Sequence, residues 1–224
     1  MANDYGNWFM VILNIVIFTF FVKTAFKPQT KQDWRTFRIF SAFLVALFAE
    51  MYGFPLTIYL LTSYFSNRLG IDLTHDSGHI LNRILRISGD PHFSYLHIIS
   101  NILIAGGLIL IAIAWKALFK SQKKNTLAII GPYHYIRHPQ YVGFVLIIIG
   151  FLLQWPTLIT LIMAPILTVM YIRLARKEEK EMILQFSKEY EKYKNSVPAF
   201  FPSPKTILTD TINSLIKEKI TLKN

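Results

Sequence analysis

The sequence contains no cysteine among its 224 residues, which excludes disulfide bonds, thiolate catalysis and zinc sites built on cysteine. Acidic residues are scarce, since 13 Asp and Glu stand against 24 Lys and Arg, giving a formal net charge of +11. There is no internal repeat and no low-complexity segment. No basic residue precedes the first apolar run, so we expect that run to be a membrane span rather than a cleavable signal peptide.

Apolar runs dominate what the sequence does contain, with 53% hydrophobic residues and a mean hydropathy of +0.37. Crossing about 30 Å of hydrocarbon takes roughly 20 apolar residues in a helix. Five runs approach that length, and the fourth is short and ends at Gln154-Trp155-Pro156, which predicts a helical hairpin with the fifth. The runs cover residues 8–22, 39–65, 96–118, 141–153 and 158–172. The predicted fold class is all-α: a polytopic membrane bundle of about five transmembrane helices with a cytoplasmic C-terminal helix.

Basic residues gather in the connections between the apolar runs. Segments 23–38 and 116–140 are strongly basic, whereas segment 66–94 is near neutral. Cytoplasmic loops of membrane proteins carry the excess of Lys and Arg, so we expect the N-terminus outside and the C-terminus in the cytoplasm. The charge fits an anionic membrane face, and without an arginine-rich helix or an aromatic-interleaved basic patch we expect no nucleic-acid partner.

The chain divides into three expected parts. Residues 1–120 form the N-terminal transmembrane helices, and residues 121–202 hold the informative motifs. Residues 203–224 form a tail, for which an interfacial amphipathic helix and a frayed end are both open.

The most informative stretch is residues 131–143, which read GPYHYIRHPQYVG. Pro139 suits the first turn of a helix that enters the membrane, and it biases His138 towards an extended conformation. Tyrosine rings here could hold an adenine, and free N–H groups at the helix start could hold a carboxylate or hydroxyls. An alternative is an interfacial aromatic belt beside which Arg137 extends its charge to water.

A second element follows Arg173, where the sequence turns polar and predicts a water-exposed helix to about Tyr193. Met182, Phe186, Tyr190 and Tyr193 recur at helical spacing and predict one apolar-aromatic face, which Glu178 shares. The acidic run is also typical of a solvated face with i,i+4 pairs to lysine, and we favour that interpretation for Glu179 and Glu181.

These two motifs, in this order around a membrane hairpin, resemble the isoprenylcysteine carboxyl methyltransferase family, to which phospholipid methyltransferases are related. The resemblance covers about residues 125–202 and includes the ending Tyr-x-x-Tyr with Val-Pro. It implies S-adenosylmethionine as cofactor and a lipid or hydrophobic small molecule as methyl acceptor. The residues that it implies at the cofactor are Thr126, Leu127, Ala128, Tyr133, His138, Pro139, Gln140, Tyr141 and Glu178.

For the acceptor, the family associates an arginine four residues before the glutamate, but this sequence has Leu174 there. We therefore expect Arg173 in that role. Ser187 stands where the family usually has glycine. Glu50 lies in a long apolar run, and it either faces the acceptor or is neutral and hydrogen-bonded to Asn14 or Asn101.

Other interpretations remain open at this point. An NADPH-dependent membrane reductase of the sterol type shares a similar Arg-His-Pro hairpin, and a non-enzymatic membrane module could keep the same fold. The i,i+4 pair His75 and His79 could hold a metal on a helix, although Gly78 argues against it and we expect none.

Overall fold

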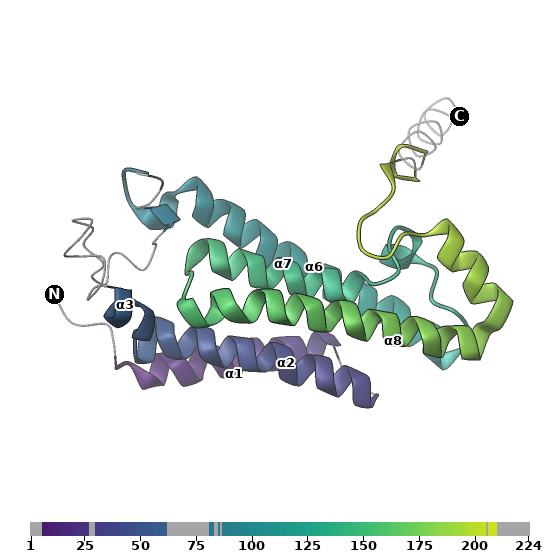
Figure 1. The fold of residues 1–224 in the computed structure, drawn as a ribbon, viewed down its shortest axis with the longest axis horizontal. Helices are drawn as coiled ribbons and strands as arrows, with labels where there is room; N and C mark the ends of the chain where they lie inside the picture. Colours follow the sequence, from purple (N-terminus) through teal and green to yellow (C-terminus); the bar gives the residue numbers. More distant parts are fainter. Residues whose placement is uncertain are drawn as a thin grey trace, which may run out of the picture.

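The computed structural model describes residues 6–26, 30–61, 81–82, 85, 87–204 and 206–209. Within these ranges the regular elements are helices, joined by loops, and no strand forms (Figure 1). The predicted all-α class is confirmed. The pair His75 and His79, and the tail from residue 210, fall outside the described ranges. The elements in order are α1 (Trp8–Phe26), α2 (Lys31–Phe48), the π-helical η1 (Ala49–Gly53), α3 (Leu56–Leu61), the 3-10 helix η4 (Pro91–Phe93), α6 (Tyr95–Lys123), the 3-10 helix η5 (Gly131–His134), α7 (Pro139–Gln154) and α8 (Leu158–Ser196).

Three described segments are long and apolar enough to cross a membrane: Asp33–Gly53, Tyr95–Lys123 and Leu158–Ser196. Two shorter apolar helices, Trp8–Thr24 and Pro139–Gln154, complete the five that the apolar runs predict. The protein is therefore an integral membrane protein built as a helical bundle. At a rise of 1.5 Å per residue, residues 158–186 of α8, which precede a bend at Ser187, extend ~44 Å, more than the ~30 Å of hydrocarbon, so the helix is long enough for its polar part to lie beyond the membrane.

The second span differs from the predicted run 39–65. Its helix begins earlier, at Lys31, because Thr30 caps it and Asp33 closes a reciprocal capping box. It ends earlier too, at Gly53, where η1 gives way to an extended Phe54 (φ −115°, ψ 109°) ahead of Pro55. Proline disfavours helical geometry in the residue before it, which explains the break.

The hairpin of α6 and α7 packs closely through glycine. A Cβ atom added at Gly107 would lie 2.6 Å from the carbonyl oxygen of Gly143, and one added at Gly150 would lie 3.0 Å from that of Ser100. These positions let the two backbones approach in an antiparallel pairing, because a larger side chain would hold the helices apart. The predicted break between α7 and α8 is confirmed, with Thr157 capping the start of α8.

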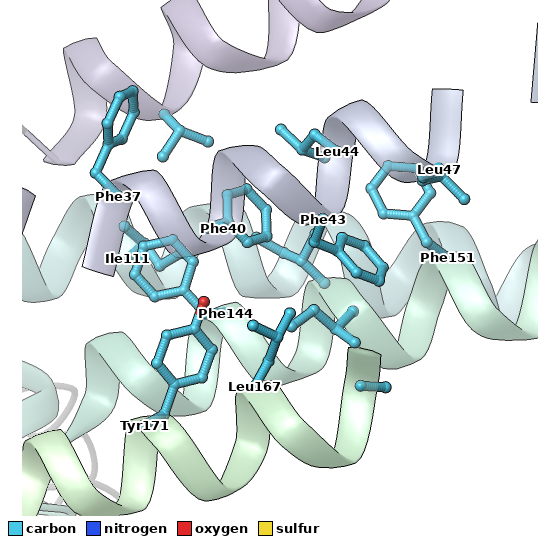
Figure 2. Packing of buried hydrophobic residues seen from close by; sticks show 14 of the residues in the cluster. Phe37, Phe40, Phe43, Leu44, Leu47, Ile111, Phe144, Phe151, Leu167 and Tyr171 are labelled. Carbon is cyan, nitrogen blue, oxygen red and sulfur yellow. The ribbon is translucent and has the colours of Figure 1, made fainter. Parts of the chain in front are cut away.

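The core lies where α2, α6, α7 and α8 meet, and Figure 2 shows its side chains between these helices. Phe40 and Phe144 pack with ring centroids 4.9 Å apart, and Phe144 stacks on Tyr171 at 5.6 Å. The start of α2, the end of α6, the start of α7 and the middle of α8 lie together at one end of the bundle, to the right in Figure 1.

Candidate functional site

The loop before α7 folds against the segment that follows α8. The backbone N–H of Arg137 donates to the carbonyl of Pro198 at 2.9 Å, and that of His138 donates to Ala199 at 3.1 Å. The hydroxyl of Tyr193 donates to the carbonyl of Tyr133 at 2.7 Å. The two sequence motifs, which lie on either side of the hairpin, therefore form one site.

A charged cluster fastens this junction. The Nε and Nη2 atoms of Arg137 donate to Oε1 of Glu179 at 2.9 and 2.7 Å. Nη1 of Arg137 donates to the carbonyls of Lys194 and Val197. The Lys194 ammonium lies 3.0 Å from the other oxygen of Glu179, so the carboxylate joins the loop to both halves of α8.

His138 stands between two adjacent glutamates. Its Nε2 lies 3.2 Å from Oε1 of Glu179, and its Nδ1 lies 3.5 Å from Oε2 of Glu178. Tyr141, one turn into α7, donates its hydroxyl to Oε1 of Glu178 at 2.6 Å. Glu178 is thereby held in a fixed position although its side chain is 31% exposed.

The second half of α8 reaches over the loop because the helix bends at Ser187. This residue has φ 43° and ψ −120°, a conformation that glycine favours. The bend brings Tyr190 and Tyr193 down on Leu127, and Met182 and Phe186 pack around them. The predicted apolar-aromatic face is confirmed, and the bend gives a physical reason for the glycine that the related family has where this chain has Ser187.

These elements line a partly open cavity of about 690 Å³ at this end of the bundle. Its walls come from the start of α2, the end of α6, the connection from residue 125 to η5, the start of α7 and the second half of α8. Eight of the nine residues expected at the cofactor line it: Thr126, Leu127, Ala128, Tyr133, His138, Gln140, Tyr141 and Glu178.

The remaining expected site residues lie elsewhere. Pro139 is buried at the first position of α7 and does not line the cavity. Arg173 is exposed on α8 and does not line the cavity, whereas the next residue, Leu174, does. Glu50 lies roughly 28 Å further along its helix from Lys31, so it is far from the cavity. The expected roles of these residues stay predictions.

The sequence left two environments open for Glu50, one facing the acceptor and one hydrogen-bonded to Asn14 or Asn101, and the structure gives it another partner. It is 5% exposed, and its Oε2 accepts a hydrogen bond from the backbone N–H of Thr57 at 3.3 Å. The hydroxyl of Thr57 in turn accepts from the N–H of Leu158 at 2.8 Å. The amide of Asn14, which the sequence offered as a partner, donates to the carbonyl of Met10. Glu50 therefore stabilises the break after η1 and its junction with α8.

Two buried groups make the cavity suited to a polar ligand. Nε2 of Gln140 is buried without a hydrogen-bond partner among the described residues, so a donor is available in the cavity wall. Burial raises the pKa of Tyr133 well above its ordinary value, and the nearby Glu178 charge raises it further. Like an ordinary tyrosine, Tyr133 is protonated at neutral pH, so its hydroxyl can donate a hydrogen bond.

Sequence reasoning missed Glu179 as part of the site. We interpreted it as one member of a solvated acidic run, but its side chain is only 12% exposed and holds Arg137. The interpretation suits Glu181, which makes an exposed i,i+4 pair with Lys177 at 3.7 Å. Nothing in the local spacing separates the two acids, because the partner of Glu179 lies 42 residues away in the chain.

The start of α2 was also missed. Four residues of its cap and first turns, Thr30, Lys31, Asp33 and Arg35, line the cavity. Sequence patterns placed them in a basic connection before the second span. Only the earlier helix start, fixed by the capping box, brings their side chains to the cavity.

Fold and site together define an integral membrane protein with a partly open cavity at one end of a helical bundle. Residues 94–184 match the isoprenylcysteine carboxyl methyltransferase family. The resemblance predicted from the two motifs is thus confirmed over α6, α7 and most of α8.

One curated relative is similar to this chain over 111 residues, with 34% identity covering 46% of this chain and 51% of the relative. It is the cobalt-zinc-cadmium resistance protein CzcN of Cupriavidus metallidurans. The chain therefore spans about half the length of the curated relative that it matches. No solved structure matches the chain.

Proposed function

We propose that this protein is an integral membrane methyltransferase that uses S-adenosylmethionine and acts on a lipidic or hydrophobic acceptor. One observation carries the proposal: the two motifs shared with the methyltransferase family converge on a single cavity of about 690 Å³. Ligand pockets of this kind are typically 300–1,000 Å³, so the size suits a nucleoside-containing cofactor.

The chemistry of the cavity wall fits this cofactor. Aromatic side chains of Tyr190 and Phe186 offer faces for an adenine ring, and the Glu178 carboxylate can accept hydrogen bonds from ribose hydroxyls. The unpartnered amide of Gln140 and the protonated hydroxyl of Tyr133 can donate to a carboxylate. Each of these groups is held by packing or by a neighbour, which favours a preorganised site.

S-adenosylmethionine supplies an electrophilic methyl group on a positively charged sulfur, so the chain needs no nucleophile of its own. The residues of this chain bind and orient the reactants and exclude water. The buried side chains of His138, Tyr190 and Tyr193 line the cavity, the two tyrosines from the part of α8 that follows its bend. A carboxylate acceptor loses no proton on methylation, whereas an ammonium acceptor must first be deprotonated.

The proposal places the cavity on the cytoplasmic side, where the cofactor is available. The support is the charge pattern, because residues 31–35 and 118–140, from the two basic segments, supply walls of the cavity. A lipidic acceptor would then reach the cavity from the bilayer, while the soluble cofactor enters from the water.

The family match favours this function over a membrane reductase of the sterol type. The relative's name concerns metal resistance and states no reaction. Among the described residues, no group of three or more His, Cys, Asp or Glu side chains is arranged to hold a metal ion.

Cofactor binding tests the proposal directly. The purified protein should be stabilised against heat by S-adenosylhomocysteine and not by NADPH. Calorimetry should show weaker binding for His138→Ala and Glu178→Ala, with Glu189→Ala as the matched control, because Glu189 is exposed on α8 and does not line the cavity. Incubation with labelled S-adenosylmethionine and a total lipid extract should then yield a methylated product by mass spectrometry. Stabilisation by NADPH alone, or by neither ligand, would contradict the proposal.

A further inference from the structure

The charged side chains that line the cavity differ in how they are paired. Arg137 is bound to Glu179, and Lys177 lies beside Glu181. Glu178 accepts the hydroxyl of Tyr141 and faces His138. These groups on the α7 and α8 walls therefore already have neighbours of the opposite charge or a hydrogen-bond donor.

The α2 wall is different, because it presents two cations with no such neighbour. Lys31 and Arg35 line the cavity, and neither lies within 4 Å of a carboxylate among the described residues. They are four residues apart in α2, so their side chains share one face of the helix. The nearby Asp33 is used within its own helix, where Oδ2 accepts the N–H of Thr30 at 2.8 Å.

An aromatic side chain of the kind found at membrane interfaces lies between Lys31 and Arg35 in the sequence. The adjacent Trp34 is 41% exposed and packs edge-on against Phe37, a placement typical of a membrane-interface aromatic. The α8 wall that carries Glu178 faces the same cavity from another helix. An amphiphile entering from the bilayer would therefore bring its headgroup to α2 while its chain stays in the apolar phase.

We infer that Lys31 and Arg35 position the methyl acceptor by binding a negatively charged group, a carboxylate or a phosphate, on an amphiphilic molecule. This inference rests on the proposed function and adds the acceptor's charge to it. The exposed Arg173, which the sequence suggested for the acceptor, does not line the cavity, whereas these two cations do. Lys31 and Arg35 are positioning residues and carry no step of the transfer.

The test uses the full chain in neutral detergent, in the presence of S-adenosylhomocysteine. Binding of hexadecanoate and hexadecyl phosphate is compared with that of hexadecanol, which has the same chain and no charge. The variants are Lys31→Gln with Arg35→Gln, and, as a matched control, Arg38→Gln, whose side chain is exposed on α2 and does not line the cavity.

Wild-type protein and Arg38→Gln should bind at least one anionic amphiphile about tenfold more tightly than hexadecanol, because charge-assisted hydrogen bonds outweigh neutral ones. The double variant should lose that preference and keep its affinity for S-adenosylhomocysteine. An unchanged preference in the double variant would overturn the inference even where the cofactor product binds normally.

Two further arms separate the possible failures. Inorganic phosphate and acetate at the same concentrations should not displace the amphiphile, and displacement by either would reduce the site to one for free anions and overturn the acceptor assignment. Failure of wild-type protein to bind S-adenosylhomocysteine while the anion preference persists would contradict the proposed function. If wild-type protein binds S-adenosylhomocysteine but shows no preference for the anionic amphiphiles over hexadecanol, only the inference is overturned.

Discussion

Arg137 and Glu179 are 42 residues apart in the chain and meet at 2.7 Å between Nη2 and Oε1. Their side chains are 11% and 12% exposed, so the pair is largely removed from water. The Nη1 atom of Arg137 also donates hydrogen bonds to the carbonyls of residues 194 and 197, which follow the bend of α8. One ion pair thus holds the loop, the helix and the cap over the cavity together.

Replacing Glu179 with glutamine should destabilise the protein markedly. The change leaves the buried guanidinium of Arg137 without its counter-charge, and removing one partner of a buried pair typically costs about 3–5 kcal/mol. Thermal unfolding in detergent measures the effect. The control is Glu181→Gln, which removes only an exposed i,i+4 pair and should change stability by less than about 0.5 kcal/mol. Equal effects of the two changes would contradict the role assigned to Glu179.

Close packing of the α6–α7 hairpin predicts opposite effects at adjacent glycines. A Cβ atom at position 107 would lie 2.6 Å from a backbone oxygen, which cannot move aside, so Gly107→Ala should destabilise by about 1–3 kcal/mol. At Gly106 an added Cβ atom meets nothing within 4 Å, so Gly106→Ala should gain up to about 1 kcal/mol from helix propensity. Chemical unfolding of both variants measures the difference. Equal tolerance of alanine at the two positions would rule out the packing described.

The bend of α8 predicts a stabilising change. Ser187 has φ 43°, which costs an ordinary L-residue roughly 1–2 kcal/mol, and its side chain is exposed. Glycine removes this strain but adds about 0.5–1 kcal/mol of unfolded-chain entropy, so Ser187→Gly should stabilise the protein by up to about 1 kcal/mol. Ser187→Ala keeps the strained Cβ and should show no gain in melting temperature. A loss of stability on glycine substitution would mean that the helix is straight at this residue.

Much of the architecture could be predicted from sequence because apolar runs and turn residues are local signals. The five apolar helices, the hairpin break at Trp155-Pro156 and the helix start at Pro139 all follow from such signals. The predicted start of the second span was too late, because the charged residues Lys31 and Arg35 were assigned to a loop although they lie in the first turns of α2. The capping residue Thr30 and Asp33 three positions later were the signal that could have corrected it.

The candidate site was predictable only in part, for a related reason. Tyr141 and Glu178 belong to motifs that the family resemblance picks out, and they meet at 2.6 Å. Glu179 and Arg35 belong to no such motif, and their roles depend on which helices come together in space. Local periodicity shows which residues lie on the same face of a helix, but it does not show which other helix packs against that face.

The last prediction compares two tyrosine hydroxyls, that of Tyr171 in the core and that of Tyr141 at the cavity. Its ring stacks on Tyr141 at 5.5 Å, and Figure 2 shows it packed beside Phe144. The hydroxyl is buried and has no hydrogen-bond partner among the described residues, and the residue does not line the cavity. A buried hydroxyl without a partner costs about 1–3 kcal/mol, so Tyr171→Phe should raise stability by about 1 kcal/mol and leave cofactor binding unchanged.

Tyr141→Phe is the matched comparison, because it removes a hydroxyl from a ring stacked on the same core. This hydroxyl donates to Glu178 at the cavity, and without it the carboxylate loses a hydrogen bond that fixes its position. Binding of S-adenosylhomocysteine, measured by calorimetry, should weaken about tenfold for Tyr141→Phe, as expected for loss of a hydrogen bond to a charged group. If Tyr171→Phe weakens binding as strongly, the Tyr171 hydroxyl contacts the ligand and the cavity extends deeper into the bundle than its present walls.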